Sequence, residues 1–148
     1  MISGKMSYNF FKIFSISKNE KKLFFEAYFT SFIVRISLIF TSFNNYSKKI
    51  GTLNSEAKTI NNFRSETINP IRLAVKRAAK YSLWRNKCLE QAITAKKILK
   101  KRNIESTIYF GVCKNNNLLE AHAWVKVGEM FVVGEKNHKR FTVVAYYS

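Results

Sequence analysis

The sequence has 148 residues and contains no aspartate, so all nine of its acidic residues are glutamates. This absence removes the residue that most often completes a catalytic triad behind a histidine. Cysteine is also scarce, and two cysteines exclude a small secreted domain built on disulfides. With two histidines and no C-x-x-C pair, neither a structural zinc site nor a cofactor is expected.

Positive charge is abundant by contrast, because 26 lysines and arginines outnumber nine acids and give a net charge of +17. Such a charge raises nucleic acid as a partner. The basic residues are spread almost evenly over the chain, however, and the basic stretch 96–102 holds no aromatic residue for base stacking. A nucleic-acid-binding module stays an alternative, but no nucleic acid is expected. At 47% hydrophobic residues, this length predicts one folded domain.

Residues 23–43 form a long apolar stretch and raise the question of a membrane-spanning helix. Glu26 and Arg35 interrupt it, and lysines on both sides give no orientation bias. We expect a helix that is buried or membrane-peripheral, which keeps a membrane-associated scaffold as a second alternative. Residues 1–22 lack a secretory signal, so the expected location is the cytosol, with reduced thiols.

Two helices are predicted in the middle of the chain. The first takes Asn69 as its N-cap and Pro70 as its first residue, and ends near Trp84. The second begins after the N-cap Asn86 and carries the basic residues 96–102 at its C-terminal end, as the helix macrodipole favours. Cys88 then lies in the first turn of the second helix.

After residue 103 the pattern alternates between apolar and polar, which predicts strands at 107–113, 120–127, 130–135 and 141–147. Helices followed by an antiparallel meander are typical of the α+β class. A two-residue turn at Gly128-Glu129 would pair the second and third strands. Without a bulge, this register sets His122 opposite Glu135, on the face turned away from the apolar layer.

The predicted positions of Cys88, His122 and Glu135 suggest nucleophilic catalysis. A helix N-terminus stabilises a thiolate, and its free N–H groups can bind an oxyanion. An imidazole beside a carboxylate is an oriented base. Taken singly, each residue also has a structural reading: Cys88 as a small core residue, His122 as a hydrogen-bonded strand residue, and Glu135 as an exposed carboxylate.

Several short motifs resemble the lasso peptide biosynthesis protein B family, the leader peptidases of the microcin J type. The resemblance is carried by CLEQA at 88–92, LKKRNI at 99–104, YFGV at 109–112, AHAWV at 121–125 and VGE at 133–135. It extends upstream to residues 26–27 and 71–79 and so covers nearly the whole chain.

The resemblance implies a transglutaminase-like, papain-like cysteine protease fold. It implies a single peptidase domain over residues 1–148, with a helical part at 1–83 and a catalytic core at 84–148. Members of the family cleave the leader from a ribosomally made precursor peptide, which an asparagine-synthetase-like lasso cyclase then closes. Residues 1–80 read as helical rather than as the strand-first leader-recognition domain, so that domain is expected in a separate protein.

The family's nucleophile and base correspond to Cys88 and His122. Its acid is commonly an aspartate about a dozen residues after the histidine, and this chain has none. Glu135, thirteen residues after His122, is the best substitute, and a Cys88–His122 dyad is the alternative.

Overall fold

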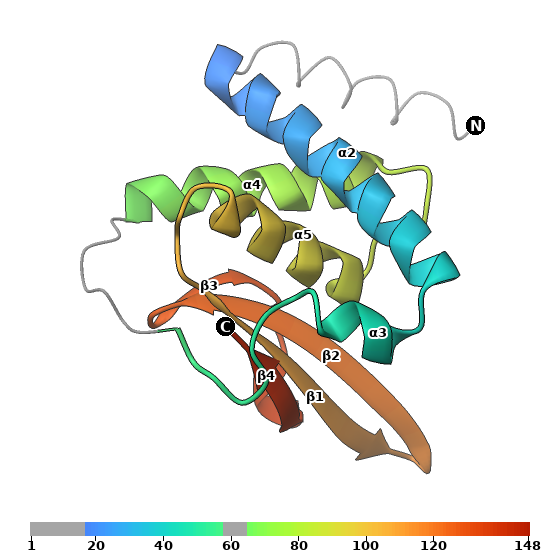
Figure 1. Cartoon of the computed structure of the whole chain (residues 1–148). Coiled ribbons are helices and arrows are strands. Elements are labelled where there is room, and N and C mark those ends of the chain that lie inside the picture. The colour runs from blue at the N-terminus through green and yellow to red at the C-terminus, as the bar shows by residue number, and fades with distance from the viewer. Residues whose placement is uncertain (1–16, 58–64) are drawn as a thin grey trace.

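The computed structural model describes residues 17–57 and 65–148. Within these ranges a group of helices covers one side of a four-stranded sheet (Figure 1). The helices are α2 (Lys18–Phe40), α3 (Phe43–Ser47), α4 (Ser65–Tyr81) and α5 (Cys88–Lys100). This order of helices before strands confirms the α+β prediction. The expectation that the N-terminus lacks a secretory signal rests on residues 1–22, most of which lie outside the described ranges.

The helix α2 begins with a capping box that the sequence analysis did not identify. The Ser17 hydroxyl accepts from the Glu20 backbone N–H, and the Glu20 carboxylate accepts from the Ser17 N–H. One face of α2 is buried, while large apolar side chains on the other are exposed. In the described part of the chain, α2 is the one helix long and apolar enough to cross a membrane, by length and composition alone.

The boundaries of the next two helices correct the predictions. The α4 helix extends upstream to Ser65, so Pro70 lies inside it, not at its first position, and Asn69 is not its N-cap. Proline has no N–H, so α4 does without one hydrogen bond there. The N-cap of α5 is Lys87, not Asn86, and Cys88 is the first helical residue.

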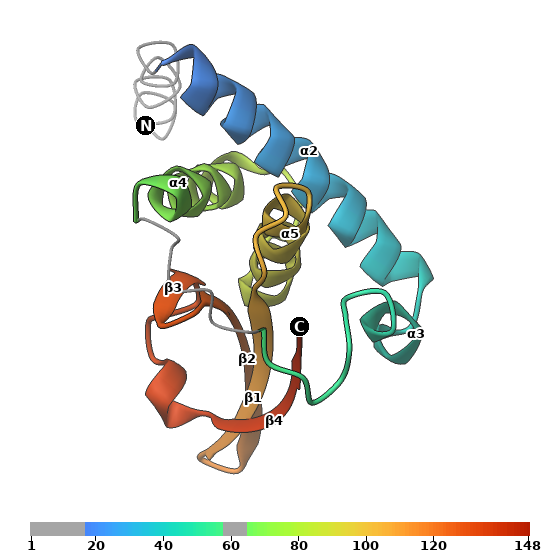
Figure 2. The same cartoon turned by 60° about the vertical axis from the view of Figure 1, so that its left-hand side comes forward.

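The sheet contains β1 (Thr107–Asn115), β2 (Leu118–Val127), β3 (Met130–Val133) and β4 (Thr142–Tyr147). All pairs are antiparallel, in the order β3-β2-β1-β4. The first three strands form the expected meander, but β4 returns to pair with β1 instead of β3. This is the order of a Greek key. The connection before β4 carries the short helix η1 (His138–Arg140), and Figure 2 shows it curving round one side of the sheet.

The predicted register between β2 and β3 is wrong beyond two residue pairs. Val127 pairs with Met130 and Lys126 with Phe131, as the two-residue turn requires, but Val125 then pairs with Val133. Val132 is therefore the extra residue of a β-bulge. Because β3 also ends at Val133, His122 and Glu135 are not a cross-strand pair.

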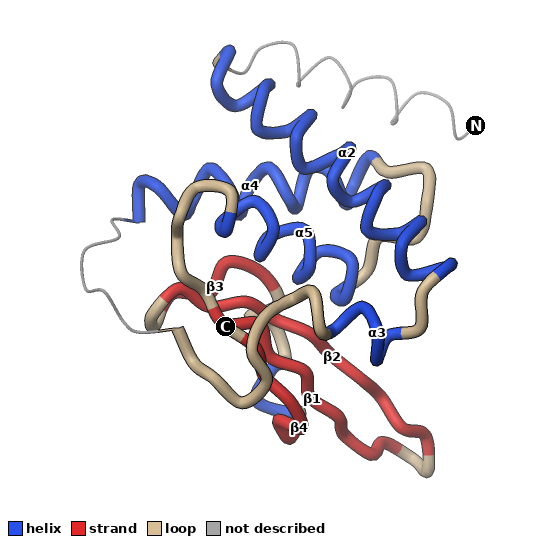
Figure 3. Tube along the Cα trace, in the orientation of Figure 1, coloured by secondary structure: helices blue, strands red, loops and turns tan. Residues whose placement is uncertain are grey.

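The core joins the helices to one face of the sheet (Figure 3). Ala92, Ala95 and Leu99 of α5 belong to the same buried cluster as Ala123 and Val125 of β2. Both α4 and α5 contact the sheet, and α2 packs across these two helices. The first residue of α5 is thereby fixed relative to the strand that carries His122.

Candidate active site

Cys88 is the first residue of α5 and is half-buried, as a free thiol. The helix has Glu90 in its first turn and Lys97 and Lys100 in its last, which is the polarity that the macrodipole favours. The prediction that Cys88 lies in the first turn of a helix is confirmed. At this position the thiol is close to backbone N–H groups that the helix leaves unpaired.

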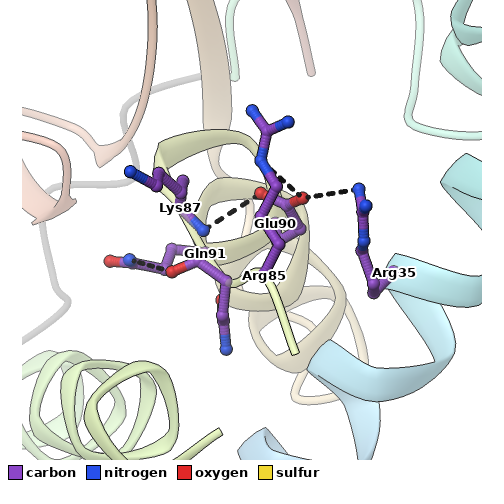
Figure 4. Close-up of polar contacts among 6 residues, drawn as sticks. Arg35, Arg85, Lys87, Glu90 and Gln91 are labelled. Carbon is purple, nitrogen blue, oxygen red and sulfur yellow. Dashed lines mark hydrogen bonds and ion pairs between the residues drawn. The ribbon is translucent and has the colours of Figure 1, made fainter. Parts of the chain in front are cut away.

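The turn that contains Cys88 is anchored by a buried carboxylate, Glu90 (Figure 4). Its oxygens accept from the Lys87 backbone N–H at 3.1 Å and from Arg35 of α2 at 3.3 Å. Arg85 lies 3.7 Å from the same carboxylate. The α5 N-terminus is thus capped by its own third residue and connected to α2. The sequence analysis did not predict the burial of Glu90 or its partners.

Asn86 is a second feature that the sequence analysis missed as a site residue. Its carbonyl accepts from the Gln91 side chain at 2.9 Å. Its side-chain amide nitrogen and oxygen are both buried, and neither has a hydrogen-bond partner among the described residues. Tyr46, Trp84 and Thr94 also have a buried polar atom without a described partner, but Asn86 lies next to the turn that contains Cys88. The signal in the sequence was a polar residue two positions before the cysteine.

His122 lies on β2, opposite Gly111 of β1, and is half-buried. Its ring stacks on Trp124 and tilts over Phe141, with ring centroids 5.8 and 5.0 Å apart. Its Nε2 lies 2.8 Å from the Gly134 carbonyl oxygen. A carbonyl can only accept, so Nε2 carries a proton, and in the neutral ring Nδ1 then presents a lone pair. The imidazole is therefore held in the tautomer that can act as a base through Nδ1.

Gly134 can supply this carbonyl because it has no side chain. Its φ is +78°, and a Cβ there would lie 2.5 Å from both the Ala123 carbonyl oxygen and the Trp124 Cβ. Glycine alone tolerates this conformation and this approach. The bulge and the glycine together place a backbone carbonyl oxygen beside the His122 ring, where the sequence analysis predicted the Glu135 carboxylate.

Glu135 follows Gly134 but lies outside β3, with its side chain exposed. Within the described ranges no hydrogen bond or ion pair joins its carboxylate to His122. Its backbone carbonyl accepts from His138 Nδ1 at 2.6 Å. The His138 ring lies 4.5 Å from that of Phe131.

The structure brings the elements of Cys88 and His122 into contact, since α5 packs against β2. His122 shares the sheet face of Trp124 and Tyr109, which stack with centroids 5.7 Å apart. Ala123 and Val125 occupy the opposite, core face. The His122 ring thus lies on the sheet face turned away from the core that α5 covers. The two elements are in contact, but no contact between the Cys88 thiol and His122 is seen among the described residues.

The second cysteine has a different environment. Cys113 is half-buried in the last, turn-side part of β1, where its Sγ lies 3.8 Å from a Glu120 carboxylate oxygen. No set of three or more Cys, His and Glu side chains within the described ranges is placed to hold a metal ion.

The family model of the transglutaminase-like superfamily matches residues 31–146. This chain belongs to that superfamily. The match spans α4, α5 and the sheet, and therefore includes Cys88, His122 and Glu135. Neither the curated proteins nor the solved structures gave a match. The transglutaminase-like superfamily includes cysteine peptidases, which is the class of enzyme that the sequence motifs indicate.

Proposed function

We propose that the protein is a cysteine peptidase that removes the leader from a lasso-peptide precursor. The main observation in support is that Cys88 begins a helix packed against the strand of His122, in a chain of the transglutaminase-like superfamily. The motifs at 88–92 and 121–125 supply the narrower assignment to leader removal.

Cys88 and His122 would act as nucleophile and base. His122 Nδ1 takes the thiol proton as the precursor binds, and the Cys88 sulfur attacks the scissile carbonyl carbon. The imidazolium then returns the proton to the leaving amine, which carries away the C-terminal part of the precursor. Water hydrolyses the thioester that remains and releases the leader. The proposal requires the Cys88 thiol and the His122 ring to come within hydrogen-bond reach when the precursor binds, since catalytic hydrogen bonds often tighten only then.

The α5 N-terminus and Asn86 would stabilise the oxyanion. The first backbone N–H groups of α5 are free of helical partners, and the buried Asn86 amide has two N–H donors with no described acceptor. Donors of this kind act where charge develops in the transition state.

Glu135 remains the proposed acid, and its support is that it follows His122 at about the spacing of the family's acid. The Gly134 carbonyl already accepts from His122 Nε2, so the neighbouring carboxylate would act by stabilising the imidazolium through space. Its contribution is therefore expected to be smaller than that of a directly bonded triad acid.

The proposed setting is the cytosol, with one peptidase domain over residues 1–148. The partners are the precursor peptide, a separate leader-recognition protein and an asparagine-synthetase-like lasso cyclase. No nucleic acid enters the proposal.

Precursor cleavage followed by mass spectrometry tests this function. Cys88→Ala should abolish cleavage while the circular dichroism spectrum and the melting temperature stay close to those of the wild type. Cys113→Ala is the matched control and should keep most of the activity. If Cys88→Ala still trims the precursor at a comparable rate, the protein is not a cysteine peptidase acting through this residue.

A further inference from the structure

The outward face of α2 consists of seven large apolar side chains between 39% and 82% exposed. They recur every three or four residues, so they form one continuous stripe along the helix: Phe25, Phe29, Phe32, Ile33, Ile36, Ile39 and Phe40. Phe43 of α3 continues the stripe in sequence and is 42% exposed. A contiguous apolar patch of this kind marks an interaction surface.

The opposite side of α2 is fixed to the rest of the protein. Leu23, Ala27 and Val34 are buried there. Arg35 contacts Glu90 of α5. These contacts hold α2 against the neighbouring helices, so in this arrangement one side of it is covered by the body of the protein.

Both acidic residues of α2 are used in ion pairs with the body of the protein. Glu20 lies 3.1 Å from Arg77 of α4, and Glu26 lies 2.6 Å from Arg102. The outward face of α2 therefore contains no carboxylate. An anionic partner would meet no like charge on it.

Lysines flank the stripe at both ends. Lys18 and Lys22 are exposed, and their positions seven and three residues before Phe25 set them on the same side of the helix. Lys48 and Lys49 are exposed just after α3. The molecule as a whole carries a net charge of +17.

We propose that the outward face of α2 binds the surface of an anionic lipid bilayer, with the helix lying in the interfacial plane. An apolar face rich in phenylalanine with lysines beside it is typical of interfacial helices. The helix is about 35 Å long at 1.5 Å per residue, so a wide strip of apolar surface would leave water. The peptidase would then work at the inner face of a membrane while its body stays in the cytosol.

Co-sedimentation of the full chain with vesicles tests this proposal. The protein should pellet with vesicles of phosphatidylcholine and phosphatidylglycerol at 3:1, and at least tenfold less with phosphatidylcholine alone. About 0.5 M salt should weaken the binding, because it screens the lysines.

The double variant Phe29→Gln/Ile36→Gln should lose at least tenfold in vesicle affinity while keeping the melting temperature and the cleavage rate in vesicle-free buffer. The matched control is Leu118→Gln/Leu119→Gln, which changes two exposed leucines, 73% and 76% exposed, at the β1–β2 turn and should bind like the wild type. Equal binding by both double variants would overturn the proposal, as would wild-type protein that stays in the supernatant. A wild-type dimer in vesicle-free buffer that only Phe29→Gln/Ile36→Gln dissociates would also overturn it, by assigning the face to a second copy of the chain. Cleavage is measured separately, so failure here leaves the peptidase proposal standing.

Discussion

His122 is oriented by backbone and aromatic rings rather than by a carboxylate. The Gly134 carbonyl holds Nε2, while Trp124 and Phe141 restrict the ring. Gly111, opposite His122, leaves room for these rings, since a Cβ there would lie 2.9 Å from the Trp124 indole and 2.8 Å from Phe141. Two glycines, Gly111 on β1 and Gly134 directly after β3, therefore determine how the proposed base is presented.

Glu135→Gln tests the proposed acid. We expect turnover to fall by about tenfold, because the uncharged amide stabilises the imidazolium less while the Gly134 hydrogen bond remains. Rates of precursor cleavage at saturating precursor provide the measurement. Glu129→Gln, which removes a 94% exposed carboxylate in the β2–β3 turn, should leave turnover unchanged. A silent Glu135→Gln would mean that the enzyme works as a Cys88–His122 dyad.

Lys96 gives a pH dependence of stability. It is buried, donates from Nζ to the Ser106 carbonyl at 2.7 Å, and lines two surface cavities, neither of which is lined by Cys88 or His122. Burial, with a smaller effect of Lys100, lowers the pKa of Lys96 from 10.5 to about 8. Between these values the unfolded chain holds a proton that the folded protein has released. Stability from this group therefore rises with pH in that window.

Urea unfolding at pH 7.5 and 9.5 measures this effect. The wild type should gain about 1 kcal/mol at the higher pH relative to Lys96→Met, which has no group to titrate there. Lys97→Met, at the exposed neighbouring position, should behave like the wild type. Identical pH profiles for wild type and Lys96→Met would contradict the lowered pKa of Lys96.

At the scale of elements, the contact between α2 and α5 depends on Glu90. Its buried carboxylate caps α5 through the Lys87 N–H and binds Arg35 of α2. A carboxylate in this position is costly to bury unless its partners stay in place. It thereby couples the position of α2 to that of the Cys88 turn.

Glu90→Gln should lower the free energy of unfolding by about 1–3 kcal/mol, because two arginines lose their carboxylate and a buried amide replaces it. Arg35→Met should cost less, since Arg85 and the Lys87 N–H still contact Glu90. Urea unfolding at neutral pH gives both values, with the exposed Glu105→Gln as control. A Glu90→Gln protein as stable as the control would show that the carboxylate does not hold α2 to α5.

At the scale of the whole molecule, cleavage should depend on a second protein. We expect the purified chain alone to process its precursor slowly. The separate leader-recognition protein should raise the rate at low precursor concentration, by increasing the effective concentration of the cleavage site at Cys88. Initial rates with and without that protein provide the measurement. Equal rates would mean that this chain binds the leader by itself.

Several features of the whole chain follow from its sequence alone. Local patterns set the helix that starts at Cys88, the four strands and the two-residue β2–β3 turn, because each depends on spacing and on residues near in sequence. The two residues of the β1–β2 turn, Asn116 and Asn117, both have positive φ, as asparagine tolerates. The motifs also sufficed for the superfamily, which the family model confirms.

The tertiary structure decided the features that depend on distant segments. The pairing of β4 with β1 and the bulge at Val132 both depend on how separate strands meet in the sheet. The one extra residue of the bulge moves Glu135 out of register with His122. The burial of Glu90 required Arg35, 55 positions earlier in the chain. The sequence also did not determine which face of α2 is exposed, because the apolar pattern of a helix does not indicate which side the other helices will cover.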